Sequence, residues 1–351
     1  MLRKGDILMG EATVWKFISA VSQGRGHLSS GTPCQDKVFH HIHGDVAVIA
    51  LADGAGSASL SHFGAERIVS DASCYIGEKF HDIVENNDAA GLKKDFLQTL
   101  LDSLHQLGNE LNCSLQDMAS TLLLAASDGQ KYFLAHVGDG VIGYVKDSEI
   151  KVASSPDNGE FANSTVFVTS SEALTSMKFF RGNLNNISSF ILMSDGAENS
   201  FYNKATKTLM PVLVDIVHRC AVFPEDTTRN QLQNSMDTVI RRKTADDCSL
   251  IMMVRKDESF SSFNDFREDI KYKLFQIPPK SSRAKTRLRY YDELLITVNE
   301  IQKCSEGYAA LTEIAKRFHL KPKYLRKRLT RLRLLDLLEE AGGKYRVLVD
   351  L

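Results

Sequence analysis

The sequence of 351 residues predicts a layered α+β domain built around a large antiparallel β-sheet. From about residue 12 to 256, short apolar runs bounded by Gly, Asp, Asn or Ser alternate with helical patterns. Closely spaced runs, such as 121–126 and 131–137 on either side of "SDGQ", predict antiparallel hairpins. Longer helical patterns lie between groups of strands, where helices would cover a sheet. Because the strands are apolar throughout, we expect the sheet to be covered on both faces.

The individual elements follow from length and periodicity. Eight runs have the length of strands, and they are 14–22, 46–52, 121–126, 131–137, 141–146, 164–170, 189–194 and 248–254. Helical patterns occupy 61–80, 92–112 and 204–220. In the second of these, leucines recur at three- and four-residue steps from Leu97 to Leu111, as expected for one face of a helix.

Composition excludes several classes of protein. No apolar run approaches the roughly 18–20 residues that cross a bilayer, so we expect no membrane partner. The N-terminal stretch "MLRKGDILMGEATVW" lacks a long apolar region, which argues against secretion. The 6 cysteines are scattered without a CxxC pair, so we expect reduced thiols in a cytoplasmic protein.

The chain divides into two parts of opposite charge. Residues 281–351 carry a formal charge of +7 and the other 280 residues carry −8, which predicts different partners for the two parts. The polar stretch 257–286 predicts a linker between domains at 12–256 and 287–351. Beyond the linker, helical stretches at 289–303, 308–318 and 322–340 precede the turn and short strand "GGKYRVLV".

Three apolar runs end in Asp-Gly, at Asp53, Asp139 and Asp195. Further acids lie beside apolar strands at Asp36 and at Asp246 with Asp247. Carboxylates that converge at one edge of a sheet repel one another, and magnesium or manganese would relieve that repulsion. The carbonyl of Gly54 could join such a site because glycine allows close approach of the backbone. The alternative is that Asp-Gly simply forms turns, although turns do not explain "CQD" or "ADD".

The order "CQD … ADGAGS … GDG … SDG … DDCS" resembles that of the metal-dependent (type-2C, PPM) serine/threonine protein phosphatases. The longer motifs "SQGRGHLSSGTPCQD", "LADGAGS", "HVGDG", "PDNGEFAN", "MSDG" and "ADDCSLIMM" are similar to the PphC-like bacterial branch of that family. The resemblance covers roughly 12–256, with all motifs in order.

This resemblance implies an antiparallel β-sandwich flanked by helices (αββα), with two Mg²⁺ or Mn²⁺ ions at one end. Asp53 would bridge both ions and the Gly54 carbonyl would join one, while Asp36, Asp195 and Asp246 match the other acidic positions. Asp139 matches the position of a third, more weakly held ion. Two such ions make hydroxide from a bridging water and stabilise in-line displacement at a phosphomonoester.

Several positions depart from the family pattern. Gln35 replaces an acid, and Gly31 occupies the place of a phosphate-binding arginine. Arg25 could grip phosphate instead, and His27 could protonate the leaving alkoxide; the alternative for His27 is a structural role in its loop. Asn199 replaces an acid that often follows "SDG".

The branch motif "GEFAN" supplies two further candidates, Glu160 and Asn163. They could line the substrate side of the site, or Asn163 could merely cap a turn.

The C-terminal part resembles a winged helix-turn-helix module. "LTEIAKRF" would be a first helix, "HLKP" the turn, "KYLRKRLTRLRLLDLL" a second helix and "GGKYRVLV" the wing. The second helix carries a basic face opposite Leu325, Leu329 and Leu332. The basic residues are Lys323, Arg326, Lys327, Arg331 and Arg333. Such a face suits DNA, but modules of this kind also dock or dimerise proteins, and a basic face can simply be solvated.

Three hypotheses follow. The first is a cytoplasmic bacterial phosphatase acting on phosphoserine and phosphothreonine, with a phosphoprotein substrate from a partner Ser/Thr kinase and a C-terminal module that recruits it to DNA or protein. The second is a phosphatase-like sensor without catalysis that controls a DNA-binding regulator, which Gln35 and Asn199 favour. The third is a hydrolase of a phosphorylated small molecule.

Overall fold

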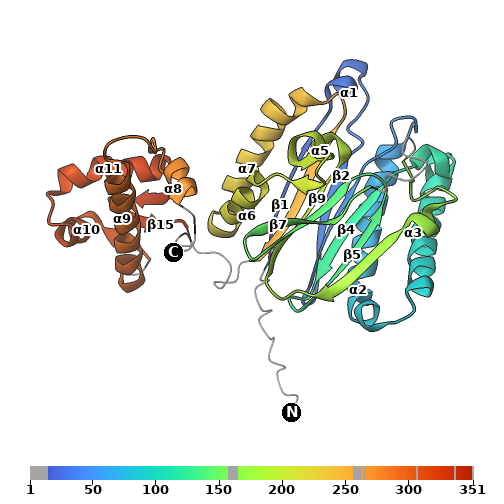
Figure 1. Cartoon of the computed structure of the whole chain (residues 1–351), viewed down its shortest axis with the longest axis horizontal. Coiled ribbons are helices and arrows are strands. Elements are labelled where there is room, and N and C mark those ends of the chain that lie inside the picture. Colours follow the sequence, from blue (N-terminus) through green and yellow to red (C-terminus); the bar gives the residue numbers. More distant parts are fainter. Residues whose placement is uncertain are drawn as a thin grey trace, which may run out of the picture.

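The computed structural model describes residues 15–156, 165–255, 263, 266, 268–305, 307–335 and 337–349 (Figure 1). Its larger part is a sandwich of two antiparallel sheets of five strands each. In hydrogen-bonded order, the first sheet contains β1 (Trp15–Ser22), β12 (Cys248–Arg255), β9 (Ile187–Met193), β6 (Val141–Lys146) and β7 (Glu149–Ser154). The second contains β2 (Lys37–His43), β3 (Val46–Ala52), β4 (Leu122–Ser127), β5 (Lys131–Val137) and β8 (Lys178–Asn183).

The continuous apolar run of β3 is explained by burial of both of its faces. Ala47, Ile49 and Leu51 lie in the core between the two sheets. The alternate residues of the strand, from Val46 to Ala52, pack against helices on the outer face. Because side chains alternate along a strand, each face of β3 finds its own apolar partner. The sheet is therefore covered on both faces, as the sequence predicts.

Helices cover both outer faces of the sandwich (Figure 1). The long helices α2 (Ser61–Glu85) and α3 (Ala89–Leu111) pack on the second sheet. The first sheet is covered by α5 (Asp195–Phe201), α6 (Val212–Val222) and α7 (Glu225–Ser235). The short connecting elements are α1 (Arg25–Ser30), η1 (Leu115–Met118), α4 (Ala173–Ser176), β10 (Tyr202–Asn203), β11 (Thr208–Leu209), η2 (Met236–Ile240) and η3 (Arg241–Lys243).

Two predicted elements differ in the structure. Residues 165–170 form no strand, because the Ser170 hydroxyl accepts a hydrogen bond from the Phe167 N–H and closes a turn. The helix expected at 204–220 begins only at Val212, after Pro211. Before it, the Asn203 side chain accepts hydrogen bonds from two backbone N–H groups and turns the chain between β10 and β11.

The C-terminal part has its own helices, sheet and core. Its elements are α8 (Glu268–Leu274), α9 (Ala284–Cys304), β13 (Ala309–Ala310), α10 (Leu311–Arg317), α11 (Pro322–Leu334), β14 (Leu338–Ala341) and β15 (Lys344–Val347). The strands form an antiparallel sheet in the order β13-β15-β14. The helix expected over 322–340 therefore ends at Leu334, and the chain returns as a strand. Leu325, Leu329 and Leu332 are buried in this core.

Of the stretch 257–286, expected as a linker, the structure describes 263, 266 and 268–286, and much of this part is packed. Phe263, Phe266 and Phe275 are buried in the C-terminal core together with Val222 and Phe223 at the end of α6. The Phe266 ring also stacks on His218 of α6, with ring centroids 5.6 Å apart. Aromatic residues spaced through this polar stretch supply enough apolar area to fold it onto both neighbours. An apolar contact therefore joins the two parts of the chain.

No helix within the described residues has the length and apolar character needed to cross a membrane. All 6 cysteines are free thiols.

Candidate metal centre

Four aspartates lie at one end of the sandwich because of strand register. Asp36 precedes β2 and Asp53 follows β3, and the adjacent residues Lys37 and Ala52 are paired across these strands. In the other sheet, β9 runs directly into Asp195, while Asp246 stands just before the antiparallel β12. The aspartates of the two sheets interact electrostatically, since Asp53 is influenced by Asp36, Asp195 and Asp246. The structure thus gathers four side chains that are far apart in the sequence.

Burial and mutual repulsion make this cluster electrostatically unfavourable without a cation. Burial, with the charges of Asp247 and Asp195, raises the pKa of Asp36 to about 7. Burial and the charges of Asp139 and Asp246 raise the pKa of Asp195 to about 6. Burial also raises the pKa of Asp53 well above its ordinary value, and three neighbouring aspartates add to the effect.

Three buried oxygens of the cluster lack a hydrogen bond of normal geometry within the described chain, although the Ser194 and Ser249 hydroxyl groups lie near enough to Asp36 to lower its pKa. Both carboxylate oxygens of Asp36 and Oδ1 of Asp195 are buried, and none has a hydrogen-bond partner of normal geometry among the described residues. Asp36 is only 2% exposed, so water has little access to it. Buried acceptors without donors are costly unless a cation coordinates them. A site made only of carboxylate and carbonyl oxygens suits hard ions such as Mg²⁺ and Mn²⁺.

Glycines permit the close approach of the segments that carry the acids. A Cβ on Gly24 would lie 2.3 Å from the carbonyl carbon of Asp246, and one on Gly196 would lie 1.9 Å from the carbonyl oxygen of Asp247. A Cβ on Gly54 would lie 2.8 Å from the side chain of Ser61. Side chains at these positions would push the strand ends apart. The glycines that follow Asp53 and Asp195 therefore allow close packing of neighbouring segments as well as a turn of the chain.

The backbone of Asp53 is fixed on both sides by one residue. Its N–H donates to the Thr121 hydroxyl at 2.9 Å, and its carbonyl accepts from the Thr121 N–H at 2.8 Å. Thr121 stands at the start of β4, which pairs with β3. The carboxylate of Asp53 therefore projects from a rigid support.

Asp247 organises the loops around the cluster, a role that the sequence did not reveal. Its Oδ1 accepts a hydrogen bond from the Gly24 N–H at 2.6 Å, and its Oδ2 accepts one from the Gln35 N–H at 2.6 Å. The same Oδ2 lies 2.9 Å from Nδ1 of His27. His27, Asp246 and Asp247 also bring one ligand atom each within 4.8 Å of one another. In the sequence, the second aspartate of "ADD" is the one feature that could have indicated this role.

The two candidates upstream of Asp36 lie in the short helix α1 or at its start. The Nε of Arg25 donates to the Thr244 carbonyl at 3.0 Å, which ties α1 to the loop that carries Asp246. His27 is 18% exposed, and its Nδ1 lies close to Asp247 Oδ2 without a hydrogen bond of normal geometry. Gly31 ends α1 with a φ of 72°, a conformation that an arginine would adopt only with strain. The family's arginine position is thus used here as a helix cap.

Asp139 stands at the edge of the cluster, where it influences Asp195. Its carboxylate accepts a hydrogen bond from the Thr165 hydroxyl. Asn199 is exposed, whereas the preceding Glu198 is buried and its Oε2 lies 2.6 Å from Nζ of Lys204. Lys204 also interacts with Asp139 and Asp195 and was not among the predicted site residues, since no motif marks it.

Glu160 and Asn163 lie outside the described residues. Gln35 is 3% exposed, and its Oε1 has no hydrogen-bond partner among the described residues.

The five basic residues predicted on one face of α11 have three different surroundings in the structure. Lys327 and Arg331 of α11 line a pocket shared with α9. Arg331 Nη2 donates to the carbonyls of Phe275 and Gln276, so this side chain supports the fold of the module. On the other flank, Arg333 pairs with Glu340 of β14 at 3.6 Å. Lys323 and Arg326 are exposed.

Comparison with known proteins places this geometry in a family. The family model described as "Protein phosphatase 2C" matches residues 23–237, well over half of the chain. Among curated proteins, the chain is 27% identical to Serine/threonine-protein phosphatase 3 of Escherichia coli (strain K12) over 172 residues, which is 47% of this chain and 67% of that protein.

Solved structures share the fold. A bacterial serine phosphatase superposes with a TM-score of 0.50 at 15% identity, covering 70% of this chain and 99% of that one. Serine/threonine phosphatase Stp1 from Staphylococcus aureus superposes with a TM-score of 0.50 at 16% identity, covering 73% and 100%. The predicted α+β phosphatase fold is therefore confirmed for the sandwich. The chain belongs to the protein phosphatase 2C family of phosphoprotein hydrolases.

Proposed function

We propose that this chain hydrolyses phosphoserine and phosphothreonine in proteins, using two divalent ions held by its acidic cluster. The observation that carries the proposal is the convergence of Asp36, Asp53, Asp195 and Asp246 from both sheets, with pKa values raised by burial at the first three. A substrate of this kind is the product of a Ser/Thr kinase.

The donor set fits two hard ions. Asp53 would bridge them, the Gly54 carbonyl would join one, and Asp36, Asp195 and Asp246 would complete the protein ligands. Such ions, when bound, supply a hydroxide from water and neutralise charge that develops on the phosphate. Asp139 stands beside Asp195, in a position to take part in a weaker third site.

The side chains around the cluster supply binding and proton transfer. Because Asp247 faces Nδ1 of His27, the imidazole is oriented with Nε2 left to hold and donate a proton to the departing Ser or Thr oxygen. Arg25 is anchored through Nε, which leaves its terminal nitrogens to bind phosphate oxygens. Lys204, paired with Glu198, adds a fixed positive charge beside Asp139 and Asp195.

Manganese-dependent hydrolysis tests this proposal directly. We expect the full chain to hydrolyse p-nitrophenyl phosphate and a phosphothreonine peptide only with Mn²⁺ or Mg²⁺. The isosteric variant Asp53→Asn should lose more than about 100-fold in rate, since even residues behind metal ligands cost 10–100-fold. If the wild type is no faster than the variant, catalysis is excluded and the sensor hypothesis, which the neutral Gln35 favours, takes its place.

We further propose that the C-terminal part is a winged-helix module that recruits the enzyme to DNA or to a protein. The order α9, β13, α10, α11, β14 and β15 supports this proposal, as does the exposure of Lys323 and Arg326 on α11. Because Phe263 already belongs to its core, we place the start of the module near 263 rather than 287. DNA binding that weakens steeply between two salt concentrations would support a nucleic-acid role, and no binding at low salt would contradict it.

A further inference from the structure

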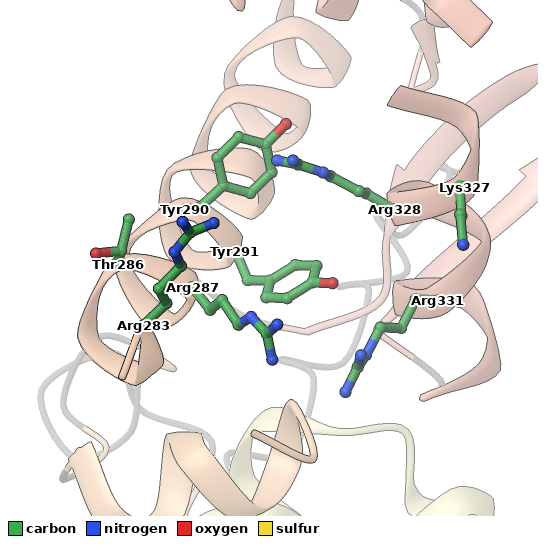
Figure 2. Close-up of a pocket in the computed structure, with 8 residues that line it drawn as sticks. All are labelled: Arg283, Thr286, Arg287, Tyr290, Tyr291, Lys327, Arg328 and Arg331. Carbon is green, nitrogen blue, oxygen red and sulfur yellow. The ribbon is translucent and has the colours of Figure 1, made fainter. Parts of the chain in front are cut away.

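A basic pocket lies between α9 and α11 of the C-terminal module (Figure 2). It has a volume of about 560 Å³, and no acidic residue is among those that line it. The basic residues that line it are Arg283, Arg287, Lys327, Arg328 and Arg331. Five cations with no acid between them give the pocket a positive potential that attracts an anion. None of these residues belongs to the acidic cluster of the phosphatase domain.

The N-terminus of α9 adds to the positive potential. Arg283 is the N-cap residue, Arg287 follows one turn later, and the first turn of the helix contains no acidic residue. No side chain caps the free N–H groups at this end. Helix N-termini carry a partial positive charge and ordinarily attract acids, so a basic first turn is an unusual choice. An anion bound here would satisfy both the N–H groups and the side chains.

Part of the pocket is rigid. Arg331 donates through Nη2 to the carbonyls of Phe275 and Gln276, at 2.8 and 2.9 Å. The guanidinium carbon of Arg328 lies 3.9 Å from the centre of the Tyr290 ring, and that of Arg331 lies 5.8 Å from the centre of the Tyr291 ring. These guanidinium groups occupy a face of each ring. The tyrosines are therefore poor platforms for stacking nucleic-acid bases, which need an open ring face.

The remaining polar groups of the pocket are available to a ligand. Arg283, Arg287 and Lys327 make no ion pair with any residue that the structure describes. Tyr291 is 8% exposed, and its hydroxyl group forms no hydrogen bond within the described chain. Figure 2 shows this hydroxyl pointing into the space between the two helices, on the side of Arg331.

Away from the pocket, the module's positive charge is partly neutralised by acids, although Lys323 and Arg326 of α11 make no ion pair within the described residues. There, Arg333 pairs with Glu340 and Arg346 pairs with Glu339. A duplex bound along a recognition helix and its wing would use that side of the module. In the pocket, by contrast, five basic residues line a concave site of limited volume that no acidic residue lines. Such a site suits a compact phosphate group with its neighbouring residues better than a nucleic-acid backbone.

We propose that this pocket binds the phosphate group of a phosphoserine or phosphothreonine in the substrate protein, away from the catalytic centre. The inference rests on the proposed function, because a protein phosphatase meets phosphoproteins. A substrate with two phosphates would be held through one while the other is hydrolysed. Binding of one phosphate in the pocket raises the effective concentration of the second phosphate at the catalytic centre.

The test measures binding to the full chain in EDTA, where hydrolysis does not consume the probe. Fluorescence anisotropy is recorded with a labelled phosphothreonine peptide, its unphosphorylated form, and a DNA duplex. The pocket variant is Arg287→Ala combined with Lys327→Ala. The matched control is Lys303→Ala with Lys344→Ala, which removes two exposed positive charges of the same module that lie outside the pocket.

We expect the phosphopeptide to bind the wild type and the control variant equally, and the pocket variant about tenfold or more weakly. The unphosphorylated peptide should bind none of them well. Equal phosphopeptide binding by the pocket variant would overturn the proposal. Loss of DNA binding alone would overturn it too, and would assign the pocket to nucleic acid.

A kinetic measurement separates this inference from the proposed function. With Mn²⁺, the pocket variant should show a raised KM for a doubly phosphorylated peptide, with unchanged kcat and unchanged hydrolysis of p-nitrophenyl phosphate. An unchanged KM for that peptide would contradict substrate docking. If no variant or wild type hydrolyses any substrate, the proposed function fails, while the anisotropy result in EDTA still stands.

Discussion

The acidic cluster of the sandwich and the basic pocket of the C-terminal module concentrate charge in opposite ways. The aspartates are short side chains at strand ends, where Asp36 is only 2% exposed, Asp53 and Asp195 are half-buried and Asp246 is exposed. The cations of the pocket are long side chains on two helices, and most remain in contact with water. Burial raises the pKa of the acids, whereas solvated cations keep their charge at little cost. We therefore expect bound ions to stabilise the acidic cluster as well as to serve its proposed chemistry, whereas the pocket would need its ligand only for binding.

Near the acidic cluster, the variant expected to have the largest effect on catalysis is His27→Gln. If His27 protonates the leaving oxygen, kcat for a phosphothreonine peptide should fall by about 10²–10⁴-fold. Hydrolysis of p-nitrophenyl phosphate should change little, because nitrophenolate leaves without a proton. Steady-state kinetics on both substrates gives the result, with exposed His43→Gln on β2 as the control. Equal losses on both substrates would show that His27 is structural.

The pH dependence of stability should distinguish the buried acids from the solvated cations. Without metal, Asp36 and Asp195 keep protons to about pH 7 and about pH 6 in the folded state, but ionise near their ordinary pKa when unfolded. Their stabilising effect is complete below pH 4 and is lost as pH rises through 6 and 7. In EDTA, the free energy of unfolding should fall over this range by on the order of a few kcal/mol.

Urea unfolding at several pH values measures this loss. Added Mn²⁺ at pH 7.5 should reverse it, and Asp36→Asn should flatten the profile measured in EDTA. A metal-free stability that does not change between pH 4 and 7 would contradict the account of the cluster.

A smaller effect is expected at Asp247. Asp247→Asn keeps the shape of the side chain but weakens the acceptor of the Gly24 and Gln35 N–H groups and removes the negative charge 2.9 Å from His27 Nδ1. Activity on the phosphopeptide should fall about 10–100-fold, as for other residues that orient a site. Combined with His27→Gln, the loss should be less than the product of the two single losses. Independent, multiplying losses would show that Asp247 does not act through His27.

The smallest effect belongs to the C-terminal module. Arg331→Lys removes the two hydrogen bonds to the Phe275 and Gln276 carbonyls and should destabilise the module by about 1–3 kcal/mol. Hydrogen exchange should quicken in α9 and α11, while β3 and β4 and hydrolysis of p-nitrophenyl phosphate stay unchanged. Exposed Arg326→Lys is the control. Equal protection in both variants would show that Arg331 is free to serve a ligand.

Local pattern predicted seven of the ten strands of the sandwich, because a buried strand leaves an apolar run in adjacent residues. It missed β2, β7 and β8, which lie at sheet edges and are partly exposed. The run before Asp53 is apolar since both faces of β3 are buried, and the Asp-Gly pair records the end of that strand. The partners of Asp247 were hidden, because Gly24, His27 and Gln35 are more than 200 residues away in the chain.

The C-terminal elements show the limits of the same reasoning. The stretch 257–286 reads as a polar linker, and only the tertiary structure shows that Phe263, Phe266 and Phe275 meet apolar partners on α6 and α9. The sequence predicts that the basic residues of α11 share one helical face. In the structure, Lys327 and Arg331 line a pocket with α9, whereas Arg333 pairs with Glu340 of β14. Contacts between distant segments decided both outcomes.

The central claim is that the acidic cluster is a two-metal centre, and a calorimetric titration of the metal-free chain with Mn²⁺ at pH 7.5 tests it most directly. The account predicts two ions bound per wild-type chain, with proton release as the buried carboxyl groups ionise. Asp53→Asn should lose both ions, because both would share this ligand, while Asp139→Asn should keep them. An absence of binding by the wild type, or unchanged binding by Asp53→Asn, would contradict the claim.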